Sequence, residues 1–441
     1  MGLEGKLKNV LRNLSVIALA GSIAFSAGCN SKKKDPFFSQ IREQVRASLE
    51  ERFSASGGRI IPPYDRTMGT VIMHSKPDLA LQETLIESLP KYSQIVLLTN
   101  ESLEDYVNET IARMDIDPRR VHITAYDDDY MNRGLWAQDI MEVLSTSNGK
   151  VIVLPEFFTF PLHYLFNLPP SQSSNEFKSF LENQGFNIIT ANEYFEGGNV
   201  TYDYFNNKEL LFIGDSSFIN RNLVYLTSAE RSKAVADLHT NFGADLVYVT
   251  GQGQDSTHMF HLDQAFLLTG PGEVVLMDLS YAKPADFKGL EDDILELYKL
   301  DKEKLLVNEY AGEASFLEEY DYLSEKGAVT NILEETKNIL DSLNKLFVNL
   351  GYKIHKYPLD PWQNIHFQSY ANSVVFKDKD TGKKKILLPM FPNSKGNYDF
   401  NSKNNKAAQD FFKGLGFDVI PVVNPTWFLG GNINCLMTVY E

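Results

Sequence analysis

The stretch Ile332–Ile354 reads ILEETKNILDSLNKLFVNLGYKI, and its order of helix, turn and strand decides the fold. Apolar residues recur along it at the 3.6-residue period of an amphipathic helix. The predicted buried face consists of Ile332, Thr336, Ile339, Leu343, Leu346, Phe347 and Leu350. Gly351 follows this face directly, and glycine commonly ends a helix because it adopts the left-handed conformation. The stretch therefore predicts a helix, a glycine stop and a strand.

The same order recurs along the chain. A glycine leads into an apolar strand at four places, Gly185–Ile188, Gly243–Leu246, Gly351–Ile354 and Gly416–Val419. An earlier apolar strand opens each of these units, at Val151–Leu154, Leu210–Ile213, Val274–Met277 and Ile386–Pro389. A first unit, from Thr70–Met73 through Ile95–Leu98, makes five. This repetition indicates an α/β repeat architecture, which two long insertions interrupt at about residues 101 to 135 and 281 to 328.

The composition indicates a folded protein with an acidic surface. Of 441 residues, 43% are apolar and 12% are aromatic, which is enough for a sizeable core. The formal net charge of -16 repels phosphate backbones, so nucleic acid is not an expected partner, and it favours cationic ligands. We expect residues 59–441 to form a single domain.

Residues 1–29 are typical of an export signal. Basic residues precede an apolar run, Leu14–Phe25, that is too short to span a bilayer. The run is followed by Ser26-Ala27-Gly28-Cys29, which resembles the cleavage site of a bacterial lipoprotein. That resemblance implies that Cys29 is lipidated and anchors the exported protein in the cell envelope; a secreted protein is the alternative. Residues 30–58 are then a polar tether and a lead-in helix.

The loops that end the units carry the residues capable of chemistry. In chain order they are Trp136–Glu142, Glu196–Asn199, His261–Asp263, Ser369–Asn372 and Gly430–Cys435. If the units are arranged around an axis, these loops meet, and a thiol, an imidazole and three carboxylates share one site. Cys435 is the only cysteine besides Cys29, so it cannot belong to a disulfide framework. It is inert packing, chance or a nucleophile.

These motifs, in this order, resemble the guanidino-group-modifying superfamily, and within it the branch of agmatine deiminases and bacterial-type peptidylarginine deiminases. That family has a Trp-x-x-Asp, a Glu-Gly-Gly-Asn, a His-x-Asp and a glycine-rich loop that ends in a nucleophilic cysteine. The resemblance extends from about residue 60 to the end of the chain. It implies a five-bladed α/β propeller and hydrolytic deimination of a guanidino substrate, with arginine in a peptide giving citrulline and ammonia.

The resemblance also implies roles for individual residues. The catalytic residues would be Cys435, His261, Asp139 and Asp263, and the substrate contacts would be Glu196, Trp136 and Asn199. No metal or organic cofactor is expected. The expected partner is a cationic guanidino compound or an arginine-containing peptide, and the membrane is reached only through the lipid anchor.

Elementary chemistry supports these assignments. A guanidinium is planar and permanently charged, and Asp139 and Asp263 can each accept paired N–H donors from it. This grip places the central carbon against the thiol of Cys435, and a thiolate beside a bound cation has a lowered pKa. His261 would protonate the departing ammonia and then activate the water that releases the ureido product.

Three features depart from the family pattern. Phe260 stands where glycine usually precedes the His-x-Asp, and Asn434 stands where histidine commonly precedes the cysteine. Gln138–Glu142 reads Gln-Asp-Ile-Met-Glu, which is closer to peptidylarginine deiminases than to agmatine deiminases. The third feature favours arginine in a peptide as the substrate.

The sequence leaves other interpretations open. The same residues fit an agmatine deiminase or an amidinotransferase. Phe260 and Asn434 are compatible with a propeller that has lost turnover and serves as a surface binding protein. His258, His261 and Asp263 could instead hold the metal ion of a metal-dependent hydrolase, because His-x-x-His-x-Asp brings nitrogen and oxygen ligands close together.

Overall fold

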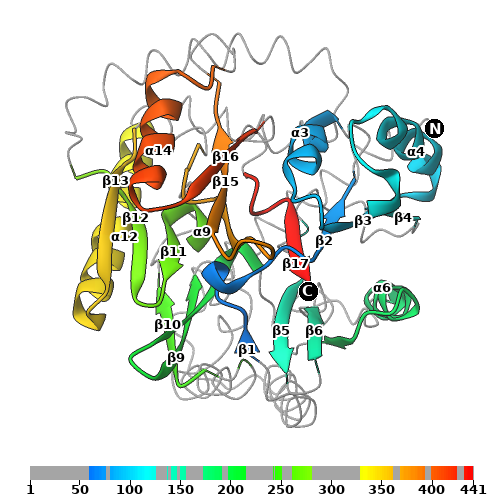
Figure 1. Cartoon of the computed structure of the whole chain (residues 1–441). Helices are drawn as coiled ribbons and strands as arrows, with labels where there is room; N and C mark the ends of the chain where they lie inside the picture. The colour runs from blue at the N-terminus through cyan, green and yellow to red at the C-terminus, as the bar shows by residue number, and fades with distance from the viewer. Residues whose placement is uncertain are drawn as a thin grey trace, which may run out of the picture. The chain divides into compact units, whose positions relative to one another are not determined.

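A computed structural model of the chain (Figure 1) describes residues 59–75, 80–125, 137, 141–146, 149–154, 172–190, 197–214, 242, 244–250, 261–280, 328–360, 368–392, 399–424 and 432–440. All the described residues belong to one compact unit, Glu51–Glu441. The predicted signal segment 1–29 and the tether 30–58 lie outside the described residues, so both stay predictions.

The described strands form five sheets with a shared topology, in which a central strand pairs antiparallel with one neighbour and parallel with another. The central strands are β2 (Thr70–His74), β6 (Gly149–Leu154), β9 (Lys208–Gly214), β12 (Glu273–Asp278) and β15 (Lys384–Met390). Their parallel partners are β3 (Gln94–Thr99), β7 (Ile188–Thr190), β10 (Leu246–Thr250), β13 (Lys353–Pro358) and β16 (Asp418–Val423). Their antiparallel partners are β17 (Met437–Tyr440), β5 (Glu142–Thr146), β8 (Val200–Phe205), β11 (Phe266–Gly270) and β14 (Val374–Lys377).

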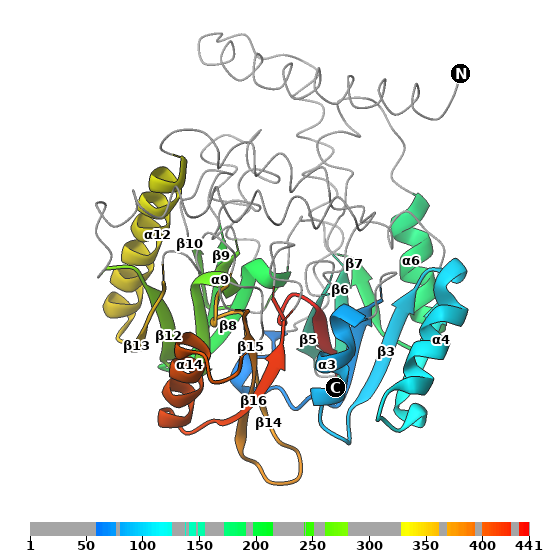
Figure 2. The same ribbon diagram turned by 90° about the horizontal axis from the view of Figure 1, so that it is seen from above.

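Helices connect four of the central strands to their parallel partners in the described part of the chain, because parallel strands need a long crossover. The described crossover helices are α3 (Ala80–Ser88), α6 (Gln172–Asn183), α12 (Ala328–Leu350) and α14 (Lys403–Gly414). Figure 2 shows α12 and α14 flanking one group of strands and α6 flanking another. Four of the five predicted strand-helix-strand units are therefore present, the connection between β9 and β10 lies outside the described residues, and the fold is α/β with five sheets.

Two features of the fold differ from the sequence prediction. The sequence pattern does not reveal the antiparallel strands, because most are only four to six residues long and follow irregular loops. The first predicted insertion, at about residues 101 to 135, contains elements that the sequence analysis did not predict: helix α4 (Glu104–Arg113) and strand β4 (Val121–Ala125), which pairs with β3 and extends that sheet. The second, at about residues 281 to 328, lies almost entirely outside the described residues.

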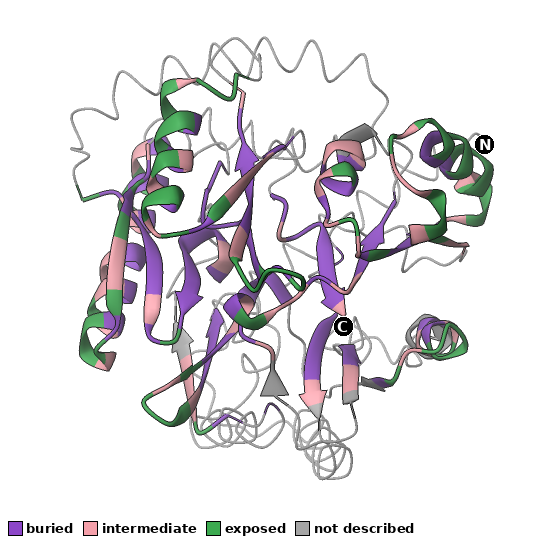
Figure 3. Cartoon of the chain, viewed as in Figure 1, coloured by how far each residue is buried: buried purple, intermediate pink, exposed green. Residues whose placement is uncertain are grey.

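The predicted buried face of α12 is confirmed. Five of its seven side chains are buried, and Leu346 and Leu350 pack against the same core. Figure 3 shows the exposed residues of α12 on the side away from the strands. No helix in the described part of the chain is both long and apolar enough to cross a membrane.

Three of the four predicted glycine stops are confirmed. Gly185, Gly351 and Gly416 have φ angles of 90°, 79° and 88°. After each, the next backbone N–H reaches back five residues to a helix carbonyl, as from Tyr352 to Phe347 at 2.9 Å. This is the Schellman arrangement, which satisfies carbonyls at the helix end. The fourth glycine lies outside the described residues.

Hydrophobic clusters join neighbouring sheets. One cluster contains side chains of β9, β12 and β15, a second joins β14 and β15 to β2 and β3, and a third joins β2 and β3 to β5 and β6. The sheets therefore adjoin one another in series through buried apolar contacts, whose release from water is the main stabilising term.

The loops that carry the sequence motifs occupy equivalent places in the five sheets. Each motif directly precedes an antiparallel strand, at β5, β8, β11, β14 and β17 in turn. Two of the loops contain a short helical turn, η6 (Gly197–Asn199) and α9 (Leu262–Ala265). The repeated topology therefore gives every motif the same position relative to its own sheet.

Gly416 and Gly414 provide a matched test of the helix stop. Gly416→Ala should lower the urea midpoint, because a Cβ in the left-handed region costs about 1–2 kcal/mol. Gly414→Ala, within α14, should raise it, because alanine is favoured over glycine in a helix by roughly 0.5–1 kcal/mol. A Cβ at either position meets no heavy atom within 4 Å, so packing should not mask these effects. Equal midpoints for the two variants would contradict the assignment.

Candidate active site

The structure brings Cys435, His261 and Asp263 together. Their sulfur, nitrogen and carboxylate oxygen atoms lie within 4.8 Å of one another, although Asp263 and Cys435 are 172 residues apart in the chain. Cys435 and His261 are each only 3% exposed. The third and fifth motif loops therefore converge at one place.

Strand pairing positions Cys435. The cysteine lies in a turn just before β17, which pairs antiparallel with β2 from Met437 opposite Met73 to Tyr440 opposite Thr70. The hydroxyl of Thr438 also donates to the carbonyl of Ala137 at 2.9 Å. The last turn of the chain is therefore held against the first sheet, and the thiol with it.

A short helical turn and Asn199 position the third motif. His261 has an extended backbone at the start of α9. Oδ1 of Asn199 accepts the N–H of Leu262 at 3.2 Å, and Nδ2 of Asn199 donates to the carbonyl of Gly214 at 3.3 Å. A Cβ on Gly214 would overlap the Asn199 side chain, so glycine is needed for this close approach. Asn199 thus holds the backbone beside His261, and its contact with substrate stays a prediction.

Asp263 combines a bonded oxygen with an unsatisfied one. Its Oδ2 accepts from the thiol of Cys435 at 3.4 Å and from Nδ2 of Asn434 at 3.0 Å. Its Oδ1 is buried and has no hydrogen-bond partner. Burial raises the pKa of the Asp263 carboxyl, while the charge of His261 and the bond from Asn434 act in the opposite direction. An unpaired carboxylate oxygen is the acceptor that a guanidinium N–H requires.

The structure adds Asn372 to the site. Its Nδ2 donates to Sγ of Cys435 at 3.1 Å, its Oδ1 accepts the backbone N–H of Asn434 at 3.0 Å, and it is fully buried. The sequence placed Asn372 in the fourth motif loop without giving it a role. The available signal was its position, because that loop is equivalent to those that carry His261 and Cys435.

The remaining predicted site residues cannot be placed. Five residues named in the sequence analysis lie outside the described residues: Trp136, Asp139, Glu196, His258 and Phe260. Their assignments stay predictions.

Of the first motif, Glu142 is described. Its carboxylate is buried, with Oε1 accepting the N–H of Val143 at 3.0 Å and lying 3.8 Å from Nη2 of Arg66. The end of the first motif is therefore anchored by a buried ion pair.

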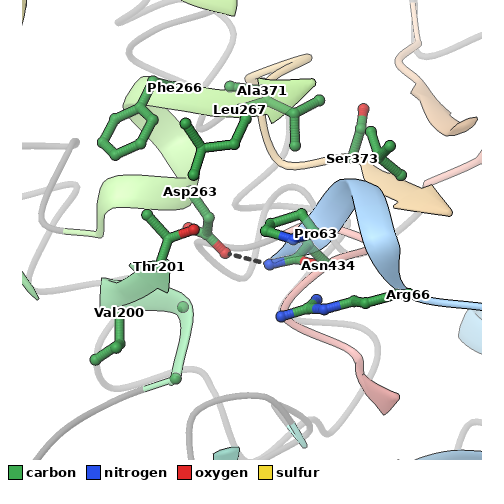
Figure 4. Close-up of a pocket in the computed structure, with 14 residues that line it drawn as sticks. Pro63, Arg66, Val200, Thr201, Asp263, Phe266, Leu267, Ala371, Ser373 and Asn434 are labelled. Atoms are coloured by element: carbon green, nitrogen blue, oxygen red, sulfur yellow. Dashed lines mark hydrogen bonds between the residues drawn. The ribbon is translucent and has the colours of Figure 1, made fainter. Parts of the chain in front are cut away.

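A cavity lies next to Asp263. Its lining includes Gly197, Asp263, Ala371 and Asn434, each from a different motif loop. Arg66, from the segment just before β2, also lines it. Figure 4 shows the carboxylate of Asp263 joined to the amide of Asn434, with the side chain of Arg66 nearby. Residues next to the second, third, fourth and fifth motifs therefore line one space.

The same three groups could hold a metal ion. His261, Asp263 and Cys435 offer nitrogen, oxygen and sulfur, which is a donor set compatible with zinc. This set contains two residues of the predicted metal-site alternative, and the third, His258, lies outside the described residues.

The chain was compared with known proteins. No protein-family model and no curated protein matches it. Among solved structures, an agmatine deiminase of Enterococcus faecalis superposes with a TM-score of 0.55 at 12% identity, over 88% of this chain and 99% of that one. The agmatine deiminase of C. jejuni gives 0.53 at 14% identity, over 87% and 96%. A protein described as a putative peptidyl-arginine deiminase gives 0.56 at 14% identity, over 87% and 99%.

The chain has the fold of these deiminases. The superpositions cover nearly the whole of each deiminase, so the shared fold is not limited to one sheet or one motif. The resemblance seen in the sequence motifs therefore extends to the structure. At these identities the likeness establishes the fold, and activity has to be argued from the site.

The ionised carboxylate of Asp263 should lower the free energy of unfolding at neutral pH. Its folded-state pKa is raised, so its contribution to stability is fully present below the unfolded pKa of about 3.9 and is lost as the pH rises through the folded value. Asp263→Asn should therefore raise the urea midpoint at pH 7, and this gain should vanish as the pH falls below about 3.9.

Asp378 is a matched control of opposite sign. Hydrogen bonds from Lys385 and Thr381 lower the pKa of its carboxyl, so its contribution is present above the unfolded pKa and is lost as the pH falls. Asp378→Asn should lower the urea midpoint at pH 7. If Asp263→Asn also lowered it, burial would not dominate the environment of Asp263.

Proposed function

We propose that this protein is a cysteine-dependent deiminase that hydrolyses a guanidino group, with arginine in a peptide or protein as substrate and citrulline and ammonia as products. The proposal includes closure of the five sheets into a five-bladed propeller with the motif loops at one end of its axis. Asp139, Glu196 and Trp136 would then complete the site.

The contact between a thiol and a carboxylate carries the proposal. Sγ of Cys435 lies 3.4 Å from Oδ2 of Asp263, and the buried imidazole of His261 belongs to the same cluster. Inert packing does not explain this arrangement, because burying a carboxyl group with an unsatisfied oxygen is costly. A bound guanidinium would donate an N–H to the unsatisfied Oδ1 of Asp263 and would place a positive charge beside this carboxylate.

The first half of the reaction forms a covalent adduct. Oδ1 of Asp263 accepts an N–H of the guanidinium and holds the central carbon near Cys435. His261 takes the proton of the Cys435 thiol, the thiolate bonds to that carbon, and the electrons of a C=N bond move to nitrogen. His261 then gives a proton to a terminal nitrogen, the C–N bond breaks, ammonia leaves, and an amidino group remains on Cys435.

The second half releases the product. His261 takes a proton from a water molecule, and the resulting hydroxide attacks the amidino carbon. The C–S bond then breaks, which restores the thiolate and releases the ureido product. An amine in place of water would give amidino transfer by the same residues, so the attacking nucleophile distinguishes these outcomes.

Sequence and expected location support arginine in a peptide over agmatine. The motif Gln138–Glu142 is closer to peptidylarginine deiminases, and an exported protein is expected to encounter peptides rather than intermediates of polyamine synthesis.

Product formation tests the proposal. The full chain in mild detergent is offered a blocked arginine peptide, agmatine and free arginine, and ureido product and ammonia are measured. Cys435→Ala should reduce turnover about 10⁴-fold or more, because the nucleophile is removed. We expect the peptide to be the preferred substrate. The absence of product from all three compounds would reject the proposal.

A chelator arm tests the metal-dependent alternative, which the His261, Asp263 and Cys435 cluster also permits. The deiminase should lose activity on alkylation of Cys435 and keep it in EDTA. Loss of activity in EDTA, with recovery on adding zinc, would favour the metal-dependent hydrolase.

We also propose that Cys29 carries the lipid anchor, on the basis of the signal sequence. The protein should partition into the detergent phase of a Triton X-114 extraction when produced in a bacterium that processes lipoproteins. Cys29→Ala should move it out of that phase. Equal partitioning of the two proteins would contradict lipidation.

A further inference from the structure

Asn434 departs from the family pattern, yet its side chain is built into the site. Its Nδ2 donates to Oδ2 of Asp263 at 3.0 Å, and its backbone N–H donates to Oδ1 of Asn372 at 3.0 Å. Asn372 in turn donates to the thiol of Cys435 at 3.1 Å. Asn434 therefore links the carboxylate to the amide that contacts the thiol.

The bond to Asn434 distinguishes the two oxygens of Asp263. Oδ2 accepts from both Asn434 and the thiol, which together use the two lone pairs of that oxygen. Oδ1 is buried without a partner. If the bond to Asn434 were lost, rotation about the Asp263 side chain would no longer be opposed by a fixed donor, and either oxygen could face the substrate.

The charges around Asn434 favour this orientation of its amide. The carboxylate of Asp263 favours the NH₂ end, because a flipped amide would place two acceptor oxygens against each other. The guanidinium of Arg66 lines the same cavity, and its side chain is 11% exposed (Figure 4). A negative group and a positive group thus line one cavity together with this amide, and both are largely shielded from water, where electrostatic effects are strong.

We propose that Asn434 is a positioning residue that fixes the carboxylate of Asp263, with Oδ2 held toward the thiol and Oδ1 left for the substrate. This inference rests on the proposed function. It also explains how the site can work without the histidine common at this position, because the asparagine amide supplies an N–H donor to Asp263.

Four variants of the full chain separate positioning from space filling. Asn434→Ala removes the donor and should raise KM for the arginine peptide about 10- to 100-fold, the range expected for losing a hydrogen bond to a charged group. Asn434→Asp keeps the shape, lacks the donor and adds a like charge, so it should raise KM at least as much. Asn434→His restores an N–H donor and should stay within about threefold of wild type. Ser342→Ala on α12 is the control and should leave KM unchanged, because it also removes one side-chain hydrogen bond, to the carbonyl of Asn338, but is exposed and does not line the cavity.

The order of the variants decides the outcome. If Asn434 only fills space, Asn434→Asp should behave as wild type and Asn434→His should be the most damaging; that result, or an unchanged KM in Asn434→Ala, would overturn the inference. A parallel titration measures Kd for agmatine by calorimetry in the Cys435→Ser background. If wild type forms no product, the proposed function fails, whereas the same order of Kd values would still support positioning. Equal Kd values, or no binding at all, would overturn it.

Discussion

The pairing of β17 with β2 is the constraint on which the candidate site depends. It joins the last strand of the chain to the central strand of the first sheet. Met437 and Val439 are buried in the same cluster as Val71 and Met73, so apolar contacts reinforce a strand of only four residues. The turn before β17 contains Cys435, and this pairing brings the thiol to Asp263. The site therefore depends on a contact between a strand near the start of the described residues and the strand at their end.

The interior of the site is polar and incompletely satisfied. Hydrogen bonds join Asn372, Asn434 and Cys435 to one another or to Asp263, while Oδ1 of Asp263 has no hydrogen-bond partner. Such an arrangement is unfavourable for stability, because burial penalises the ionised carboxylate more than these bonds compensate. A cationic ligand would relieve the penalty. The cost of the empty site is therefore an argument for binding as well as for catalysis.

The sequence predicts those parts of the fold that depend on local patterns. The face of α12 and the left-handed conformation of Gly351 follow from periodicity and glycine stereochemistry, and both are present. The strands β14 and β17 are not predicted, because each has only four residues, and β17 in addition pairs with β2, which lies far away in the sequence. Local patterns do not record such pairing.

The candidate site shows the same difference between residues that the sequence predicts and residues that it does not. Cys435, His261 and Asp263 could be chosen from motifs, because each stands in a recognisable loop. The contribution of Asn372 depends on the direction of one amide, and that of Asn434 on a contact with a residue 171 positions earlier. Asn434 was visible in the sequence only as a departure from a pattern. Its hydrogen-bond partner shows why an asparagine is suitable there.

A structure of the Cys435→Ser protein with a bound guanidine would test the central claim most directly. The account predicts a planar guanidinium whose central carbon contacts the side chain at position 435 and whose N–H groups donate to Oδ1 of Asp263, with the imidazole of His261 beside it. A metal ion held by His261 and Asp263, or a guanidine bound away from both residues, would contradict the account.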